Sequence, residues 1–206
     1  MKTFKNIMGY VVPIVVGLLI ALLIKQYWFT LVRVDGTSMD PNLYDTEQVF
    51  VMRSESIHRG SVIVFDAFGE NPEETSTKNY VKRVIAVAGD KLSAKNGVLK
   101  VNGKTIDQSY ISKSEQKATN EINNVGNWNN LLELAKRQGW QKNENTIVVP
   151  KGKYFVLGDH RSVSNDSRYW GFVDKSKVMG VVKAGFWTNK TQQININDQW
   201  QTFFAK

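Results

Sequence analysis

The chain has 206 residues, with 27 Lys and Arg against 19 Asp and Glu, a formal net charge of +8, no cysteine and only two histidines. These counts exclude disulfides, iron–sulfur clusters and a structural zinc site, so a hydrophobic core must stabilise the fold, and the length fits one domain with or without an appendage. The excess positive charge suggests a nucleic acid, an anionic membrane surface or an acidic partner, and composition does not choose among them.

The first predicted element is a membrane anchor at residues 7–24. These 18 residues carry no charge and are rich in Val, Leu and Ile, which is long enough for a helix to cross about 30 Å of hydrocarbon. Lysines flank the segment on both sides, and the aromatic run at 27–29 is typical of a membrane interface. One alternative is a cleavable signal peptide, but the bulky residues at 22–31 offer no small-residue cleavage site. The other is a buried soluble helix, which the apolar character of every face disfavours.

The flanking charges predict an internal N-terminus. Residues 1–6 would then form a short cytoplasmic segment, residues 7–24 the anchor, and residues 25–206 an extracytoplasmic domain. This domain holds 25 of the 27 basic residues and all 19 acidic ones, so six of the eight net positive charges belong to it.

The remainder of the chain is predicted to be mainly β. Two dipeptides, Asn96-Gly97 and Asn102-Gly103, favour hairpin turns. Short β-branched runs predict six strands, at residues 47–53, 61–65, 80–88, 146–149, 154–157 and 178–182.

The sequence predicts one clear helix, over residues 129–138, which Gly139 ends. The polar stretch of about 108–145 around it is interpreted as a small α+β insertion on the main sheet. The tail after Thr188 is polar but contains three aromatic residues, which suggests that it docks on the domain.

Three segments contain candidate functional residues, and the first is the turn at 34–43. It presents Ser38 between turn-forming residues, and Gly36 would let a substrate backbone approach closely. An ordinary turn serine is the alternative interpretation. Ser38 lies 14 residues beyond the predicted anchor, so it would stay within about 46 Å of the membrane even on a fully extended tether.

The second segment is the predicted strand at 80–88. Its alternation places the neighbours Lys82 and Arg83 on opposite, otherwise apolar faces, so at least one cation would be poorly solvated. Either both side chains extend to water at the strand edge, or Lys82 is desolvated and acts as a base, which arginine cannot do. A general base at neutral pH would need a lysine pKa lowered by about 3 pH units, worth roughly 4 kcal/mol.

The third segment is the loop after the strand at 154–157. It is either a solvated loop tied by Asp–Arg pairs or a functional loop, since polar groups are dense there for a purely structural element. A Ser-His-Asp triad through His160 is formally available, but Asp159 is adjacent in sequence and Ser38 lacks a nucleophile-elbow context. The polar residues of this loop are Asp159, His160, Arg161, Ser164, Asp166, Ser167 and Arg168.

Together these segments resemble the type I signal peptidases, membrane-anchored Ser/Lys endopeptidases of bacterial secretion, in the compact Gram-positive form. The resemblance covers most of residues 34–187, with matching order and spacing. The segments that carry it are GTSMDPNL at 36–43, RGSVIVF at 59–65, YVKRVIAVAGD at 80–90 and GDHRSVSNDSRYWG at 158–171.

The resemblance implies a role for each matching residue. Ser38 would be the nucleophile, its backbone N–H an oxyanion donor, Lys82 the general base and Ser164 the hydroxyl that orients the lysine. Met39 and Tyr80 would lie beside the substrate. The supporting positions would be Asp159, Arg161, Asp166, Ser167, Arg168 and Arg83, with Asp166 and Arg168 as a structural ion pair.

Four positions depart from the family pattern. Some members have a serine, a second oxyanion donor, where this chain has Gly36. His160, Ser61 and Asn42 stand where the family often has Asn, Asp and Thr. None of these changes removes an atom of the Ser/Lys pair.

The resemblance implies a β-rich catalytic domain behind one transmembrane helix in the cell membrane. The substrates would be secreted preproteins, cut after small residues such as Ala-x-Ala, with the substrate strand added to an exposed sheet edge. No cofactor, metal or nucleic acid is expected, whereas membrane lipids are expected partners and the translocon is a candidate. The alternatives are a soluble self-cleaving Ser/Lys protease, which should carry a DNA-binding domain, and a degenerate tethered binding domain, which usually lacks the Ser or the Lys.

Overall fold

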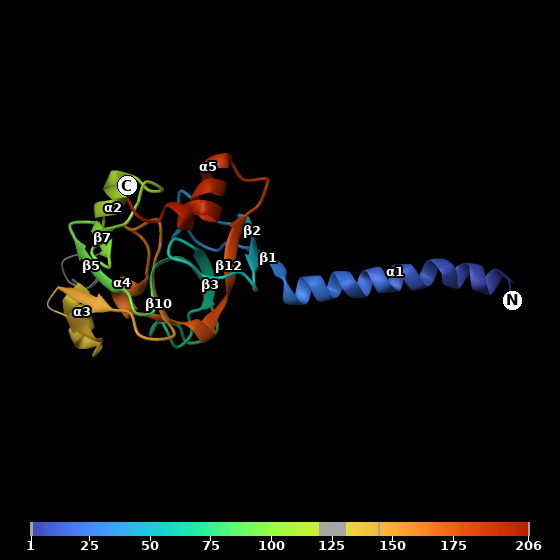
Figure 1. Cartoon of the computed structure of the whole chain (residues 1–206), viewed down its shortest axis with the longest axis horizontal. Coiled ribbons are helices and arrows are strands. Elements are labelled where there is room, and N and C mark those ends of the chain that lie inside the picture. Colours follow the sequence, from blue (N-terminus) through green and yellow to red (C-terminus); the bar gives the residue numbers. More distant parts are fainter. Residues whose placement is uncertain (1, 120–130, 144, 206) are drawn as a thin grey trace.

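The computed structural model describes residues 2–119, 131–143 and 145–205, and it shows one long helix projecting from a β-rich domain (Figure 1). The helix α1 comprises Lys2–Tyr27 and leads almost directly into the first strand. Within the described part of the chain, no helix combines the length and the apolar character that crossing a bilayer requires.

The larger sheet has seven strands, in the order β1-β2-β12-β3-β4-β10-β11, and all its paired strands are antiparallel. Strand β12 comes late in the chain but lies between β2 and β3, so the sheet joins early and late parts of the chain. The strands are β1 (Phe29–Arg33), β2 (Gln48–Met52), β3 (Val62–Asp66), β4 (Asn79–Val87), β10 (Lys153–Leu157), β11 (Val173–Asp174) and β12 (Val178–Ala184).

The smaller sheet has five antiparallel strands in the order β7-β6-β5-β9-β8. Both predicted Asn-Gly turns are present, because Asn96 (φ 50°) and Asn102 (φ 53°) adopt the left-handed conformation that such hairpins need, as do the glycines after them. The strands are β5 (Lys91–Lys95), β6 (Val98–Val101), β7 (Lys104–Thr105), β8 (Lys142–Asn143) and β9 (Thr146–Val148).

The helices of the domain are short. They are α2 (Lys113–Lys117), α3 (Leu131–Arg137), α4 (Ser167–Trp170) and α5 (Lys190–Gln193), the last continued by a π turn (Ile194–Asp198) and a 3-10 turn (Gln199–Thr202). Helix α3 confirms the predicted helix, although residues 129–130 of that prediction lie outside the described residues. So do residues 120–130 and 144 of the predicted insertion.

All six predicted strands are present, with ends within one or two residues of the prediction. The sequence does not predict strand β1, because its first residue, Phe29, belongs to the aromatic run at 27–29 that is typical of a membrane interface. The sheet partner β2, which pairs with all five of its residues, reveals it as a strand.

Three buried clusters hold the domain together. One joins the two sheets through β4, β10 and α3, and a second lies on one face of β3, β4 and β10. The third packs the turn after β1 against β2, β3, β12 and Ile196 of the C-terminal segment. With Phe203 also buried, the tail docks as its aromatic residues predicted.

Candidate active site

Ser38 lies on a compact turn between β1 and β2. The turn is tied by its own backbone, since the N–H groups of Asn42 and Leu43 both donate to the carbonyl of Met39. Gly36 adopts φ +89°, a left-handed conformation that favours glycine, and its N–H donates to Asp45 Oδ1 (2.8 Å). The turn leaves Ser38 half-buried, with its hydroxyl directed to β4.

Lys82 lies on β4, and its ammonium nitrogen is 2.7 Å from Ser38 Oγ. Nζ also donates to the carbonyl of Val81 (3.1 Å) and lies 5.0 Å from the ring centre of Tyr80. Only 4% of Lys82 is exposed, and Arg83 is fully buried. The two cations do not extend to water at a strand edge, so the structure supports the desolvated alternative.

Burial lowers the pKa of Lys82 from 10.5 to about 8. The carboxylates of Asp166 and Asp159 oppose this effect, but neither forms an ion pair with the lysine. Asp159 is paired with Arg83 instead, and Asp166 is paired with Arg168. The pKa of Lys82 is therefore close enough to neutral pH for the lysine to lose its proton and act as a base.

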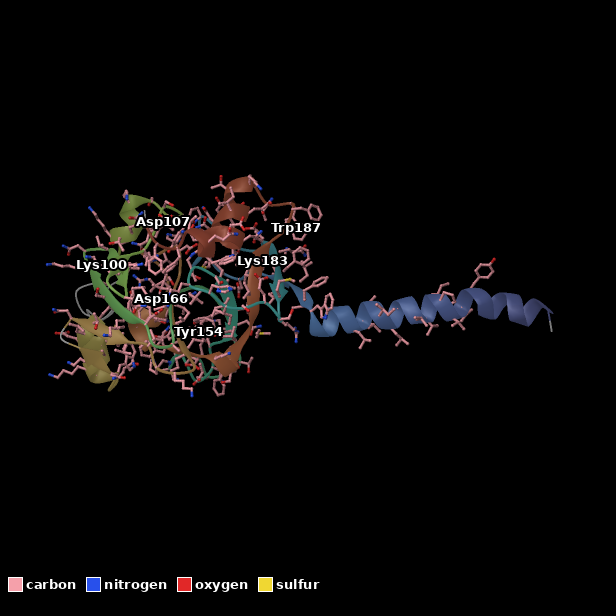
Figure 2. The ribbon with its side chains drawn as sticks, viewed as in Figure 1. Lys100, Asp107, Tyr154, Asp166, Lys183 and Trp187 are labelled. Carbon is pink, nitrogen blue, oxygen red and sulfur yellow. The ribbon has the colours of Figure 1, made fainter. Side chains whose placement is uncertain are left out.

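The loop after β10 is buried, which contradicts the solvated alternative. Asp159 forms a bidentate ion pair with Arg83, at 2.8 and 2.6 Å. Asp166 pairs with Arg168 Nε at 2.8 Å, as the resemblance implied. Burial alone would raise the pKa of Asp166, but the charge and hydrogen bonds of Arg168, with the Gly158 N–H, hold it below its usual range. Asp166, which is labelled in Figure 2, therefore stays ionised in the interior.

Two further residues of this loop brace the backbone. Ser167 Oγ accepts a hydrogen bond from the N–H of Val156 (2.9 Å). Arg161 donates to the carbonyl of Gly158 (2.8 Å) and to Gln108 Oε1 (2.7 Å). These contacts make the loop a rigid support rather than a set of reacting groups.

Ser164 differs from the expectation. Its hydroxyl does not contact Lys82, and within the described residues Ser164 Oγ is buried without a hydrogen bond of normal geometry, although it is near enough to Asp166 to favour the ionised carboxylate. The lysine is oriented by Ser38 and the Val81 carbonyl instead. The expected hydrogen bond between Ser164 and Lys82 is therefore absent from this structure.

Met39, which the resemblance places beside the substrate, has a buried side chain. It is 1% exposed and packs in the cluster that contains Val49 and Val182. Tyr80 remains half-buried beside Lys82, and its hydroxyl donates to Glu74 Oε1 (2.5 Å).

The departures from the family pattern have local partners. His160 Nδ1 lies 3.1 Å from the Thr37 carbonyl and its backbone N–H donates to the Ser38 carbonyl (3.1 Å), so the ring is not in contact with Ser38 Oγ and the formal triad is not formed. Ser61 Oγ accepts from the His58 N–H (3.1 Å). Asn42 is buried and touches Asp159, as described below.

The sequence did not indicate that the predicted insertion contributes to the site. Tyr110 accepts a hydrogen bond at its carbonyl from Asn42 Nδ2 (2.9 Å), and its hydroxyl accepts from Arg161 (3.0 Å). Glu115 of α2 accepts from the Ser162 N–H (3.0 Å). Residue types alone offered no signal for these long-range contacts. In the described residues, no group of three or more His, Asp or Glu side chains is arranged to hold a metal ion.

Replacing the buried lysine should stabilise the protein. In Lys82→Met the free energy of unfolding at pH 7 should rise by up to about 3 kcal/mol, which corresponds to a pKa lowered from 10.5 to about 8. Between pH 8 and pH 10.5, Lys82 is protonated in the unfolded wild type but not in the native state. The free energy of unfolding of the wild type should therefore increase with pH over this range, and the stability difference between Lys82→Met and the wild type should become smaller. Denaturant unfolding of the full chain from pH 7 to 10 measures this effect.

The matched control is Lys100→Met, an exposed lysine on β6 (Figure 2), which should show no such pH-dependent gain. A Lys82→Met variant less stable than the wild type at pH 7 would show that burying the cation is not unfavourable.

Comparison with known proteins places this chain in a family. The family described as signal peptidase, peptidase S26, matches residues 7–187. Signal peptidase IB of Staphylococcus aureus (strain COL) is 34% identical over 200 residues, which cover 95% of this chain and 97% of that protein. Signal peptidase I of Bacillus licheniformis is 33% identical over 187 residues, covering 88% and 89%.

Among solved structures, a crystal structure of a signal peptidase I from Enterococcus faecalis V583 is 26% identical, with a TM-score of 0.41, and the match covers 62% of this chain and 97% of that one. The assignment rests on the two sequence relatives and on the family match, which extend over nearly the whole chain. The chain belongs to the signal peptidase family, peptidase S26.

Proposed function

We propose that this chain is a membrane-bound serine endopeptidase that removes signal peptides from preproteins with Ser38 as nucleophile and Lys82 as general base. The family and its named relatives support the signal peptidase activity. The observation that carries the residue roles is the 2.7 Å contact between Ser38 Oγ and a lysine nitrogen buried from water.

The acylation step uses both residues. Neutral Lys82 takes the hydroxyl proton of Ser38 as Oγ attacks the scissile carbonyl, and an ester to the signal peptide forms as the mature protein leaves. The leaving amine receives the proton from the Lys82 ammonium. A water that Lys82 then deprotonates hydrolyses the ester and restores Ser38.

The oxyanion would be bound by the backbone N–H of Ser38. Within the described residues, this N–H has no backbone partner. The residue two positions earlier is Gly36, which has no hydroxyl to offer as a second donor, and it sits in open space. Transition-state stabilisation at this oxygen therefore relies on backbone groups.

The substrate would bind along an exposed edge. Strand β1 is the end strand of the larger sheet, and the exposed residues 35–37 connect it to Ser38. An extended preprotein segment can add its backbone hydrogen bonds there and bring its scissile carbonyl to Ser38. The residues before the cut would be small, as the resemblance implies, and Tyr80, which lies beside Lys82, would be close to them.

We also propose the membrane placement: residues 1–6 inside, residues 7–24 as the anchor and residues 25–206 outside. The 18 uncharged residues support the anchor. At the end of the domain nearest α1, where Figure 2 shows Trp187, large apolar side chains are exposed, among them Trp28 (61%) and Phe186 (87%). Aromatic side chains favour the interfacial region, so this end would face the lipid, with the positive charge of the domain favouring anionic headgroups.

Removing either member of the pair should abolish cleavage. Ser38→Ala and Lys82→Ala should each lower kcat by at least about 1000-fold, because nucleophile and base act as a unit. The measurement is cleavage of a preprotein by the purified full chain in detergent. Cleavage that persists in both variants would assign the chemistry to other residues. Arg59→Ala, which breaks only a pair with Asp90, is the control and should remain active.

The pH dependence should report Lys82. Only the neutral lysine accepts a proton, so kcat/KM should rise about tenfold per pH unit below pH 8 and level off above it, since the pKa is lowered to about 8. Initial rates from pH 5 to 9 test this limb, with unfolding monitored in parallel. A flat profile over this range would contradict the role of Lys82 as base.

The topology predicts accessibility from outside. A protease added to intact cells should digest residues 30–206, and complete protection would reverse the proposed orientation. Lysed cells provide the control for digestibility.

The lipid contact predicts higher activity in vesicles of anionic lipid than in vesicles of neutral lipid, and equal activity would remove that part of the proposal.

A further inference from the structure

We infer that Asn195 of the C-terminal segment is a positioning residue for the reaction, because it joins the turn that carries Ser38 to the strand that carries Lys82. The inference rests on the proposed function. Residue 195 lies beyond the region that the family match covers, which ends at residue 187. The segment concerned, residues 189–198, comprises α5 and the π turn after it.

Asn195 reaches the nucleophile turn through its side chain. Its Nδ2 donates to Asn42 Oδ1 at 2.8 Å. Asn42 is 2% exposed, and its own Nδ2 donates to Asp159 Oδ2 (2.8 Å) and to the Tyr110 carbonyl (2.9 Å). Both donors of the Asn42 amide are therefore used elsewhere, which leaves its oxygen to be satisfied by Asn195.

Asn195 reaches the base strand through its backbone. Its carbonyl accepts a hydrogen bond from Arg83 Nη1 at 2.9 Å, and Arg83 directly follows Lys82. Arg83 also binds both oxygens of Asp159, to which Asn42 donates. The circuit of Asn195, Asn42, Asp159 and Arg83 is closed, so the turn and the strand cannot move apart without breaking buried hydrogen bonds.

The segment that presents Asn195 is itself anchored. Ile196 is 2% exposed and packs in the same cluster as Met39, the neighbour of Ser38. The side-chain amide of Asn197 binds β12 through both its oxygen and its nitrogen. Its Oδ1 accepts from the Ala184 N–H (2.9 Å), and its Nδ2 donates to the Ala184 carbonyl (3.2 Å). Because both flanking residues are fixed, Asn195 has little freedom to follow a displaced turn.

The consequence concerns the 2.7 Å contact between Ser38 Oγ and Lys82 Nζ. Proton transfer and attack need near-ideal geometry, and a misplacement of about 1 Å can cost 100-fold in rate. In the part of the chain that the structure describes, Asn195 forms no hydrogen bond with Ser38 or Lys82 themselves, so it would act on the rate only through the turn and the strand. Loss of its side chain should slow chemistry and leave substrate affinity unchanged.

The test compares two variants of Asn195 in the full chain. Asn195→Ala removes the side chain but keeps the carbonyl that Arg83 binds, and Asn195→Asp keeps the shape but removes the Nδ2 donor. Both should lower kcat roughly tenfold with KM unchanged. The pH limb of Lys82 should stay in place, because its burial is unaltered. Asn189→Ala is the matched control, since the Asn189 side chain bonds only with Gln192 of its own turn among the described residues, and this variant should keep the wild-type kcat.

A double-mutant cycle with Asn42→Ala tests the route. If Asn195 acts through Asn42, the double variant should be no slower than Asn42→Ala alone, whereas independent roles would multiply the two losses. Wild-type kcat in both Asn195 variants, or an equal loss in Asn189→Ala, would overturn the inference. The wild type and Ser38→Ala are assayed alongside, so an inactive wild type would count against the proposed function and not against the positioning role.

Discussion

The burial of one lysine beside one serine sets the constraint on the rest of this domain. An ammonium group taken out of water is unfavourable, and the usual remedy is a carboxylate partner. Here a carboxylate partner would return the pKa of Lys82 towards its ordinary range, and the lysine would be a poorer candidate for the proposed base. The two nearby carboxylates, Asp159 and Asp166, are instead bound by Arg83 and Arg168. Because both carboxylates are paired with arginines, Lys82 has no carboxylate partner in an ion pair among the described residues.

The same arrangement explains why the site draws on distant parts of the chain. Ser38 lies on a turn after an end strand of the sheet, whereas Lys82 lies on β4, with β2, β12 and β3 between them in the sheet order. Their contact depends on the loop after β10, on the first part of the predicted insertion and on the C-terminal segment. A hydrogen-bonded network with fully satisfied members is rigid, which suits a reaction that tolerates little displacement.

The stability of the domain and its activity are therefore opposed at one residue. Desolvation lowers the pKa of Lys82, and the same desolvation costs folding free energy at neutral pH. The compensation lies in three apolar clusters, to which strands β3, β4 and β10 each contribute buried residues around the site. A domain without disulfides can support such a cost only if this core is extensive, and here it spans both sheets.

The sequence by itself determined the β-rich class, six strands, both Asn-Gly hairpins and the residues of the Ser/Lys pair, because strand periodicity, turn chemistry and motif spacing are local properties. It could not decide which of two alternating cations would be buried, since Lys82 and Arg83 are both inside and only their partners differ. It did not indicate β1, and the resemblance assigned Ser164 a hydrogen bond with Lys82 that the structure does not show. It also gave no sign that Tyr110 and Asn195 meet Asn42. Those outcomes depend on contacts between residues far apart in the chain, and only the tertiary structure brings them together.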